Sequence, residues 1–307
     1  MRRNLTQVNF EAGNIARKRQ IKMSIKKSKT KIYSHSRLST FEQCPFKFKL
    51  RYIDKIKPAI EKTIEAHLGS AVHATLEWLY NQILSGKNIP TIDEVITDYA
   101  IRWQDSYTDD TLIVKKELTQ KDYFNKGVQF LMDYYTKHHP FDDNTIEIEK
   151  KILINLDEKG KYQLQGFIDR LVYNPEKNEY EIHDYKTANN LPLKEKVEND
   201  RQLALYSIAI KETFGYEKDV CLVWHYLAHN QKICSCRTNE QLVKLKKETL
   251  ELIKKIEATE NFPTRKSILC NWCEYKEYCP KFGGKIPEQE TKKSDKKITE
   301  EELLDIW

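Results

Sequence analysis

Residues 166–187 read GFIDRLVYNPEKNEYEIHDYKT, two alternating stretches separated by the turn-forming residues 174–178. This pattern predicts a β-hairpin. If the hairpin is centred between positions 176 and 177, residues paired across it have numbers that sum to 353. Asp169 then faces Asp184, with the two Cβ atoms about 5 Å apart. Lys186 follows Asp184 by two residues and lies on the same face, so we expect two carboxylates and an ammonium in one patch.

This acidic patch has two interpretations. Facing carboxylates repel each other unless a cation lies between them, and oxygen ligands suit Mg²⁺ or Mn²⁺. Lys186 would then orient or deprotonate a metal-bound water and stabilise negative charge at phosphorus. In the alternative interpretation Asp184 and Lys186 are simply solvated on an exposed hairpin face. The residue pattern leaves both open.

The motifs in and around this hairpin resemble those of a known family. GFIDR at 166–170 and DYKT at 184–187 are similar to motifs II and III of the PD-(D/E)XK nuclease superfamily, in its RecB-like branch. Three other matches occur in the family's order and extend the resemblance over about residues 34–280: Ser36-x-Leu38-x5-Cys44-Pro45, Gly69-x3-His73 and Gln202-x3-Tyr206. The resemblance implies an α/β fold with a restriction-endonuclease-like core, in which helices flank a small mixed sheet.

The resemblance also implies a function and a set of site residues. We expect a metal-dependent DNA nuclease, an exonuclease on single-stranded DNA or DNA ends. Its expected site is as follows: His73, Asp169, Asp184 and the carbonyl of Tyr185 hold Mg²⁺ or Mn²⁺, Lys186 is catalytic, Gln202 and Tyr206 align the strand and support Lys186, and Arg170 and the basic N-terminal segment contact phosphates. Glu149 is a weaker acidic candidate, and Glu147 a further one.

Each of these residues also has a reading that needs no function. His73 lies on an apolar helical stripe, where a lone histidine is more often a satisfied core residue than a ligand. Gln202 and Tyr206 also fit the boundary of an amphipathic helix. Glu147 and Glu149 fit the alternation of an exposed strand.

Four of the seven cysteines form a pattern: Cys44 near the start, and Cys270-x2-Cys273-x5-Cys279 near the end. The three C-terminal cysteines lie among Asn, Trp, Glu, Tyr and Lys, which is not a core composition. Four thiolates hold Zn²⁺ or an iron–sulfur cluster, and the spacing does not decide between them. The arrangement resembles iron–sulfur RecB-like nucleases of the AddB type and CRISPR adaptation nucleases, which implies a [4Fe–4S] cluster.

The other three cysteines, Cys221, Cys234 and Cys236, lie in apolar or alternating stretches, and we interpret them as strand or core residues. The odd number of cysteines, in a chain without a secretory signal, favours a reducing compartment and argues against a disulfide framework.

The net charge of +6 is concentrated at one end. Residues 1–31 contain ten basic residues and one acidic residue, a charge of +9, so the other 276 residues sum to −3. This segment fits contact with a phosphate backbone or a solvated, disordered tail. It has no apolar h-region, but an organelle transit peptide remains open, and Met23 is an alternative start. A cytoplasmic, nucleoid-associated location is expected. No stretch reaches the roughly 18 apolar residues that span a bilayer, which excludes an integral membrane protein.

The periodicity predicts one mixed α/β domain at 33–282, between a basic tail (1–32) and a charged C-terminal tail (283–307). Its first half is helical and its C-terminal segment is rich in cysteine. The first expected helix is capped by a serine within residues 33–36 and runs through Leu38, Phe41, Phe48 and Tyr52. Further helices are expected at 68–84, 91–106, 118–138, 198–214 and 238–257, with strands from Ile146 and at 161–173, 179–187 and 219–227.

Partners are less determined by the sequence. No Gly-x4-Gly-Lys-Ser/Thr motif is present, so a helicase or recombination partner would be on another chain. The apolar residues in 303–307 would dock a partner or form a frayed helix end. The rival hypothesis for the whole protein is a catalytically silent DNA-binding or assembly subunit that retains the cluster.

Overall fold

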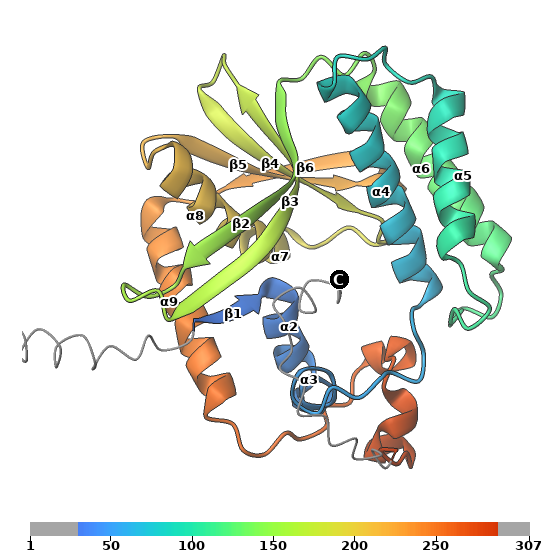
Figure 1. The fold of residues 1–307 in the computed structure, drawn as a ribbon, viewed down its shortest axis with the longest axis vertical. Coiled ribbons are helices and arrows are strands. Elements are labelled where there is room, and N and C mark those ends of the chain that lie inside the picture. The colour runs from blue at the N-terminus through green and yellow to red at the C-terminus, as the bar shows by residue number, and fades with distance from the viewer. Residues whose placement is uncertain (1–29, 288–307) are drawn as a thin grey trace, which may run out of the picture.

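A six-stranded mixed sheet forms the centre of the computed structural model, which describes residues 30–287 (Figure 1). Its order is β1-β3-β4-β5-β6, and β2 pairs with the other edge of β3. The α/β class and the restriction-endonuclease-like core predicted from the sequence are confirmed. The strands are β1 (Lys31–Ser34), β2 (Thr145–Asn155), β3 (Tyr162–Asn174), β4 (Glu179–Lys186), β5 (Asp219–Tyr226) and β6 (Gln231–Cys236).

Helices flank the sheet on two sides (Figure 1). α4, α5 and α6 share one hydrophobic cluster, and α8 and α9 pack with the strands in a second cluster. The helices are α2 (His35–Gln43), α3 (Pro45–Phe48), α4 (Ile64–Leu84), α5 (Ile92–Ser106), α6 (Gln120–His138), α7 (Lys194–Glu198), α8 (Gln202–Phe214) and α9 (Asn239–Glu257). Shorter helical turns are Lys49–Ile53, Leu227–His229, Ile268–Trp272, Lys276–Tyr278 and Pro280–Phe282.

Two of the predicted helices are interrupted in the structure. The first breaks at Cys44, whose backbone is extended (φ −157°, ψ 107°), and α3 begins at Pro45. Proline has no N–H to donate and disfavours the helical conformation of the preceding residue. The expected helix at 198–214 corresponds to α8, which begins at Gln202; Glu198 is the last residue of α7, and residues 199–201 separate the two helices.

The hairpin register agrees with the prediction over its regular part. The pairs between β3 and β4 run from Asn174↔Glu179 to Arg170↔His183, and each sums to 353. The ladder then ends, so Asp169 and Asp184 flank the point where the strands part rather than forming another ladder pair.

The ends of the chain fall mainly outside the described residues. β1 starts at Lys31, so the last two residues of the predicted tail belong to the sheet. The rest of the basic tail, the alternative start at Met23 and the apolar residues in 303–307 lie outside the described range. Within residues 30–287, no helix is both long enough and apolar enough to cross a bilayer.

Candidate active site

The site lies where β3 has no strand partner on one edge. β1 pairs with residues 162–165 of β3 and β4 with residues 170–174, while β2 occupies the opposite edge. Among the described strands, none pairs with residues 166–169 on the β1/β4 side. The backbone groups of an interior strand are normally hydrogen-bonded to a neighbouring strand. Because that neighbour is missing beside residues 166–169, side chains can lie next to this part of the GFIDR motif.

His73 connects helix α4 to both strands of the hairpin. Its Nδ1 lies 3.3 Å from Asp169 Oδ2, and its Nε2 lies 2.7 Å from the backbone oxygen of Tyr185. The backbone N–H of Tyr185 donates to Asp169 Oδ2 at 3.0 Å. The structure therefore brings together three of the predicted metal-site groups, although His73 precedes the other two by about a hundred residues in the chain.

Asp184 and Lys186 form an ion pair beside this cluster. Lys186 Nζ lies 2.5 Å from Asp184 Oδ2. Asp184 is 3% exposed, and among the described residues its Oδ2 has no hydrogen-bond partner apart from this ion pair. Burial raises the pKa of Asp184, Lys186 opposes that rise, and the negative charge of Asp169 adds to it.

The protonation state of Lys186 follows from the same pair. Burial by itself lowers the pKa of Lys186, but the charge and hydrogen bonding of Asp184 raise it by more, so the net shift is upward. Lys186 is therefore an ammonium at neutral pH. In this arrangement it can neutralise negative charge but cannot act as a free base.

Glu149 on β2 adds a further carboxylate to this side of the site. Glu149 has a left-handed backbone (φ 45°) inside β2, between the pairs Ile148↔Arg170 and Lys150↔Ile168, which puts it opposite Asp169. A positive φ is costly for a residue other than glycine, and such strained positions cluster at functional sites. Partial desolvation, together with the charges of Asp169 and Glu77, raises the pKa of Glu149 to about 7, although its side chain is exposed.

The sequence interpretation missed Glu77. It follows His73 by four residues on α4, so both lie on one face of the helix. The His-x3-Glu spacing was the available signal, but an isolated glutamate at helical spacing is too common to single out.

The ring of Tyr206 occupies the space that a side chain at Gly166, the glycine of the GFIDR motif, would need. A Cβ atom placed on Gly166 would lie 2.4 Å from Cε1 of Tyr206, closer than real contacts allow. Gln202 lies on the same face of α8 and donates from Nε2 to Tyr206 Oη at 3.5 Å. Asp184, Asp169 and Lys186 all influence the pKa of Tyr206, whose net shift is upward because of burial. Tyr206 therefore lies within electrostatic reach of the two carboxylates, and Gln202 is hydrogen-bonded to it.

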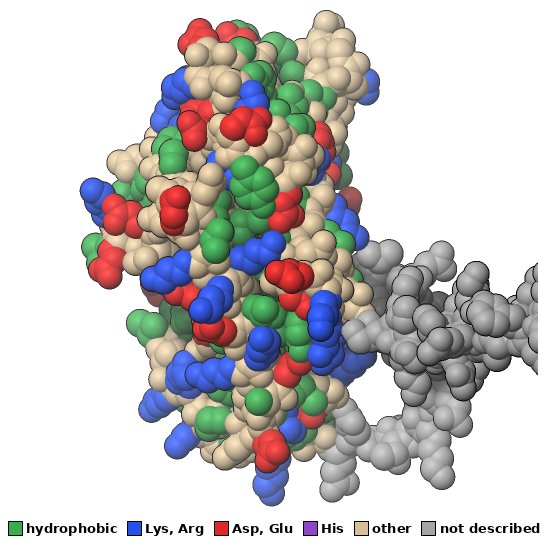
Figure 2. Space-filling model, turned by 90° about the vertical axis from the view of Figure 1, so that its left-hand side faces the viewer, with side chains coloured by type: hydrophobic (Ala, Val, Ile, Leu, Met, Phe, Trp, Pro, Cys, Tyr) green, Lys and Arg blue, Asp and Glu red, His purple; other side chains and the backbone are tan. Residues whose placement is uncertain are grey.

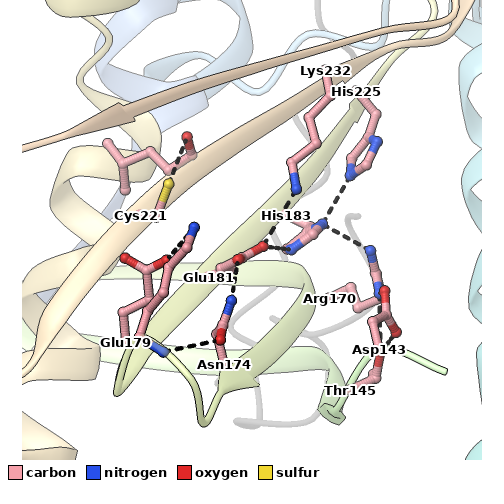
Figure 3. A network of polar contacts seen from close by, with 12 residues as sticks. Asp143, Thr145, Arg170, Asn174, Glu179, Glu181, His183, Cys221, His225 and Lys232 are labelled. Carbon is pink, nitrogen blue, oxygen red and sulfur yellow. Dashed lines mark hydrogen bonds and ion pairs between the residues drawn. The ribbon is translucent and has the colours of Figure 1, made fainter.

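Arg170 does not fulfil its predicted role. It is 0% exposed, so its guanidinium cannot contact a phosphate at the surface. Nη1 donates to Asp143 and, at 3.0 Å, to Thr145 Oγ1 (Figure 3). Nε donates to Tyr185 Oη at 3.0 Å. A planar guanidinium can donate five hydrogen bonds, and here it uses them to connect β3 with the loop before β2 and with β4. Arg170 supports the site from inside the protein.

The network continues from Arg170 into a group of histidines. Arg170 Nη2 donates to His183 Nδ1 at 2.8 Å, so His183 carries its proton on Nε2 and donates it to Glu181 at 3.0 Å (Figure 3). His225 Nε2 lies 2.8 Å from the same Nδ1. Burial, with a further contribution from Arg170, holds the pKa of His183 well below its ordinary value, so His183 is neutral at pH 7.

The donor set has the right chemistry for a hard cation, but the side chains do not enclose one. Carboxylates, an imidazole and a backbone carbonyl suit Mg²⁺ or Mn²⁺. Within residues 30–287, no group of three or more His, Cys, Asp or Glu side chains could hold a metal ion as it stands. Lys186 is paired with the carboxylate of Asp184, and His73 contacts the carboxylate of Asp169 and the backbone oxygen of Tyr185. These contacts occupy the positions at which the ligands of a cation would converge.

Cys44 and the three cysteines of the Cys270-x2-Cys273-x5-Cys279 pattern lie near one another, although they come from opposite ends of the chain. Cys44, Cys270, Cys273 and Cys279 line one cavity. The N–H of Arg265 donates to Cys44 Sγ at 3.5 Å, and the N–H of Ser267 to Cys270 Sγ at 3.4 Å. Nearby, Leu50, Ile56 and Tyr275 form a separate small core that joins the two chain segments. The sulfurs share a cavity without being close enough to coordinate one atom.

Surface charge gives no comparable signal on the face shown in Figure 2. Lysine and arginine side chains are interspersed there with aspartate and glutamate. A mixed surface of this kind is the ordinary state of a soluble domain face.

Comparison with known proteins agrees with the motifs. The family model of the PD-(D/E)XK nuclease superfamily matches residues 32–280. The chain belongs to this superfamily. No curated protein matches it.

Solved structures resemble the nuclease chain only distantly. The crystal structure of SSO0001 has 14% identity and a TM-score of 0.37, covering 86% of this chain and 91% of its own. A Eubacterium rectale protein named "Putative exonuclease" has 11% identity and a TM-score of 0.47, covering 89% and 93% respectively.

Proposed function

We propose that this nuclease-superfamily chain is an active, Mg²⁺- or Mn²⁺-dependent deoxyribonuclease that cleaves single-stranded DNA or DNA ends. The observation that supports it best is the meeting of His73, Asp169 and the Tyr185 carbonyl at the end of the β3–β4 ladder, beside the Asp184–Lys186 pair. Such a set is expected at a phosphodiesterase site because carboxylates recruit the cation and an ammonium offsets charge on the phosphate.

Each residue has a distinct role in this proposal. His73, Asp169, Asp184 and the Tyr185 carbonyl hold the cation, and Glu149 contributes a nearby carboxylate. A bound divalent cation supplies Lewis-acid polarisation of the phosphate and a more acidic water.

The remaining site residues act on the substrate. Lys186, whose pKa is raised, stays protonated, orients the attacking water and neutralises the charge that develops at phosphorus. Tyr206, held by Gln202 and packed on Gly166, orients the strand next to the carboxylates.

Cleavage of labelled DNA tests this function. Single-stranded, blunt-ended and RNA oligonucleotides are incubated with Mg²⁺ or Mn²⁺ and either the wild type or Asp184→Asn, which preserves the side-chain shape but removes the charge. We expect metal-dependent products from the wild type and none from the variant. Equal inactivity on all substrates would refute nuclease activity.

The rival in that case is a catalytically silent DNA-binding or assembly subunit. Fluorescence anisotropy with labelled DNA in Ca²⁺ distinguishes it, because such a subunit binds DNA with equal affinity in the wild type and in Asp184→Asn. The intact set of Asp169, Asp184 and Lys186 favours the active enzyme, since binding alone does not need all three.

We further propose that Cys44, Cys270, Cys273 and Cys279 hold a structural [4Fe–4S] cluster. The shared cavity and the two backbone N–H donors to sulfur support this, because N–H groups stabilise thiolate ligands and tune clusters. A cluster would close a loop of more than 200 residues. Protein purified without oxygen should absorb near 400 nm, whereas the same site filled with Zn²⁺ would not absorb there.

The cellular setting belongs to the same proposal. A DNA nuclease without a motor motif would work in the cytoplasm at the nucleoid, in repair, recombination or DNA processing, with a helicase or recombination protein on another chain. Copurification of such a partner with tagged protein from nuclease-treated extracts would test it.

A further inference from the structure

The sheet face on the α4 side is covered along only part of its length in the described structure. The cluster of α4, α5 and α6 packs on Ile148 of β2 and on Tyr185 of β4. Farther along β2 and β3, beyond Glu149 and Asp169, the side chains on this face are exposed or half-buried. We call these side chains, with one from the paired strand β1, the open face: Ile32, Lys151, Leu153, Gln163, Gln165 and Phe167.

The open face begins next to the carboxylates of the proposed metal site. Gly166 is turned toward Tyr206 of α8, on the opposite side of the sheet, and successive side chains of a strand alternate, so Phe167 projects to the α4 side. The carboxylate of Asp169 is on that side as well, because it contacts His73 of α4. Two residues of a strand span about 6.6–6.8 Å, so the ring of Phe167 is a close neighbour of the site.

The open face combines apolar side chains with amide groups. Ile32 is 45%, Leu153 48% and Phe167 37% exposed. Leu153 pairs with Gln165 and is therefore diagonal to Phe167, within reach of an aromatic ring. Gln163 and Gln165 offer amide donors and acceptors between these apolar groups. Exposed apolar side chains that lie together mark interaction sites, whereas single ones do not.

The charge and chemistry of the open face fit an unpaired nucleic-acid strand. Lys151 is exposed and pairs with Phe167 across the β2–β3 ladder, and none of the six residues is acidic. An ammonium beside an aromatic ring can hold a phosphate while the ring stacks on a base. The bases of a single strand present free faces and free edges, which match a ring and amide groups. The bases of a duplex are already stacked and paired.

We propose that the open face binds the unpaired bases of single-stranded DNA beside the phosphodiester to be cleaved, with the base nearest the carboxylates stacked on Phe167. The assignment rests on the nuclease function proposed above and adds a residue that selects unpaired strands. Lys151 contacts a phosphate of the same strand, and Gln165 contacts base edges. A blunt duplex lacks the free base that the stacking contact requires.

Binding of labelled oligonucleotides in Ca²⁺ tests the stacking contact. Fluorescence anisotropy gives the Kd of a single strand and of a blunt duplex for the wild type, Phe167→Ala and Phe167→Trp. Stacking of one base on an aromatic ring is worth about 1–3 kcal/mol by alanine substitution, so Phe167→Ala should raise the single-strand Kd about 5- to 140-fold at roughly 1.4 kcal/mol per tenfold. The duplex Kd should not change, and Phe167→Trp should restore single-strand binding.

Tyr216→Ala is the matched control for loss of an exposed aromatic ring. Tyr216 is 52% exposed and precedes β5, whose first residue, Asp219, pairs with Glu179 at the hairpin-turn end of β4. It therefore lies at the end of the sheet opposite Lys186, and its replacement should leave the single-strand Kd unchanged.

An abasic scan of the single strand provides a measurement on the wild-type protein, which does not depend on how a variant folds. Removal of the base at one position should weaken wild-type binding by about the same factor as Phe167→Ala. The Phe167→Ala variant should be insensitive to the missing base at that position, because the contact is already lost.

The outcomes separate this proposal from the nuclease function. Equal single-strand affinity of the wild type and Phe167→Ala, equal losses on single strand and duplex, or a scan without a sensitive position would each overturn the stacking role. A Phe167→Ala variant that cleaves single-stranded DNA with the wild-type KM would overturn it while leaving the nuclease function intact. Wild-type protein that binds as expected but cleaves no substrate would refute the nuclease function and support the open face as a binding surface.

Discussion

Replacing Gly166 with alanine tests how the site is packed. The new Cβ would lie 2.4 Å from Cε1 and 2.5 Å from Cζ and Oη of Tyr206. Tyr206 is 5% exposed and belongs to the core cluster that holds α8 against the sheet, so its ring has little space to move. Gly166 is not among the described glycines with positive φ, so the expected cost is steric.

The size of the effect follows from overpacking. Inserting one methyl group into a filled core costs about 1–3 kcal/mol. For a domain of this size, 1 kcal/mol corresponds to about 2–4 °C in Tm, so Gly166→Ala should lower Tm by roughly 2–12 °C. Displacement of Tyr206 should also lower the rate of DNA cleavage, because its ring packs on Gly166 of the GFIDR motif and lies within electrostatic reach of Asp169 and Asp184.

Gly69→Ala is the matched control, since this glycine also belongs to a motif. Its added Cβ would lie 3.4 Å from Thr187 Oγ1, an ordinary contact. Alanine in a helix interior is favoured over glycine by about 0.5–1 kcal/mol, so Gly69→Ala should be neutral or stabilising in thermal and urea unfolding. If Gly166→Ala unfolds like the wild type, or if Gly69→Ala is the more damaging change, the packing argument is wrong.

Three other predictions follow from the site and its support. Since the pKa of Glu149 is raised from 4.5 to about 7, folded metal-free protein retains a proton that the unfolded chain loses, so stability should fall as pH rises from about 4.5 to 7; urea titrations of Glu149→Gln should show a shallower fall, and an identical slope would contradict the assignment. Arg170→Met should cost about 3–5 kcal/mol in urea unfolding because it breaks a buried charge network, whereas Arg102→Met, which removes an i,i+4 ion pair on α5, should cost about 0.3–0.5 kcal/mol; equal losses would refute the supporting role. Cys44→Ser should abolish absorbance near 400 nm in anaerobically purified protein while Cys236→Ser retains it, and equal spectra would exclude Cys44 as a ligand.

The hairpin was largely predictable because its information is local. Turn residues at 174–178 and alternating residues on both sides specify where the strands pair, and a shift of one residue would turn every side chain to the other face. The sum of 353 therefore agrees with the structure over the whole β3–β4 ladder.

Which charged residues are buried, and which ones come close together in space, could not be predicted in this way. Arg170 is polar and adjoins Asp169 in sequence, yet it is buried because α4, α6 and the loop before β2 cover that face and supply Tyr80, Tyr134 and Asp143. Glu77 and Glu149 become neighbours only when α4 packs on β2.

The sequence by itself determined the α/β class, the register of the hairpin and the identity of its charged residues, because period, turn chemistry and spacing act between near neighbours. The tertiary structure decided which charges face one another, which of them are buried, and where β3 lacks a strand partner. These features depend on packing between segments far apart in the chain, where the free energy of each charge is set by its surroundings.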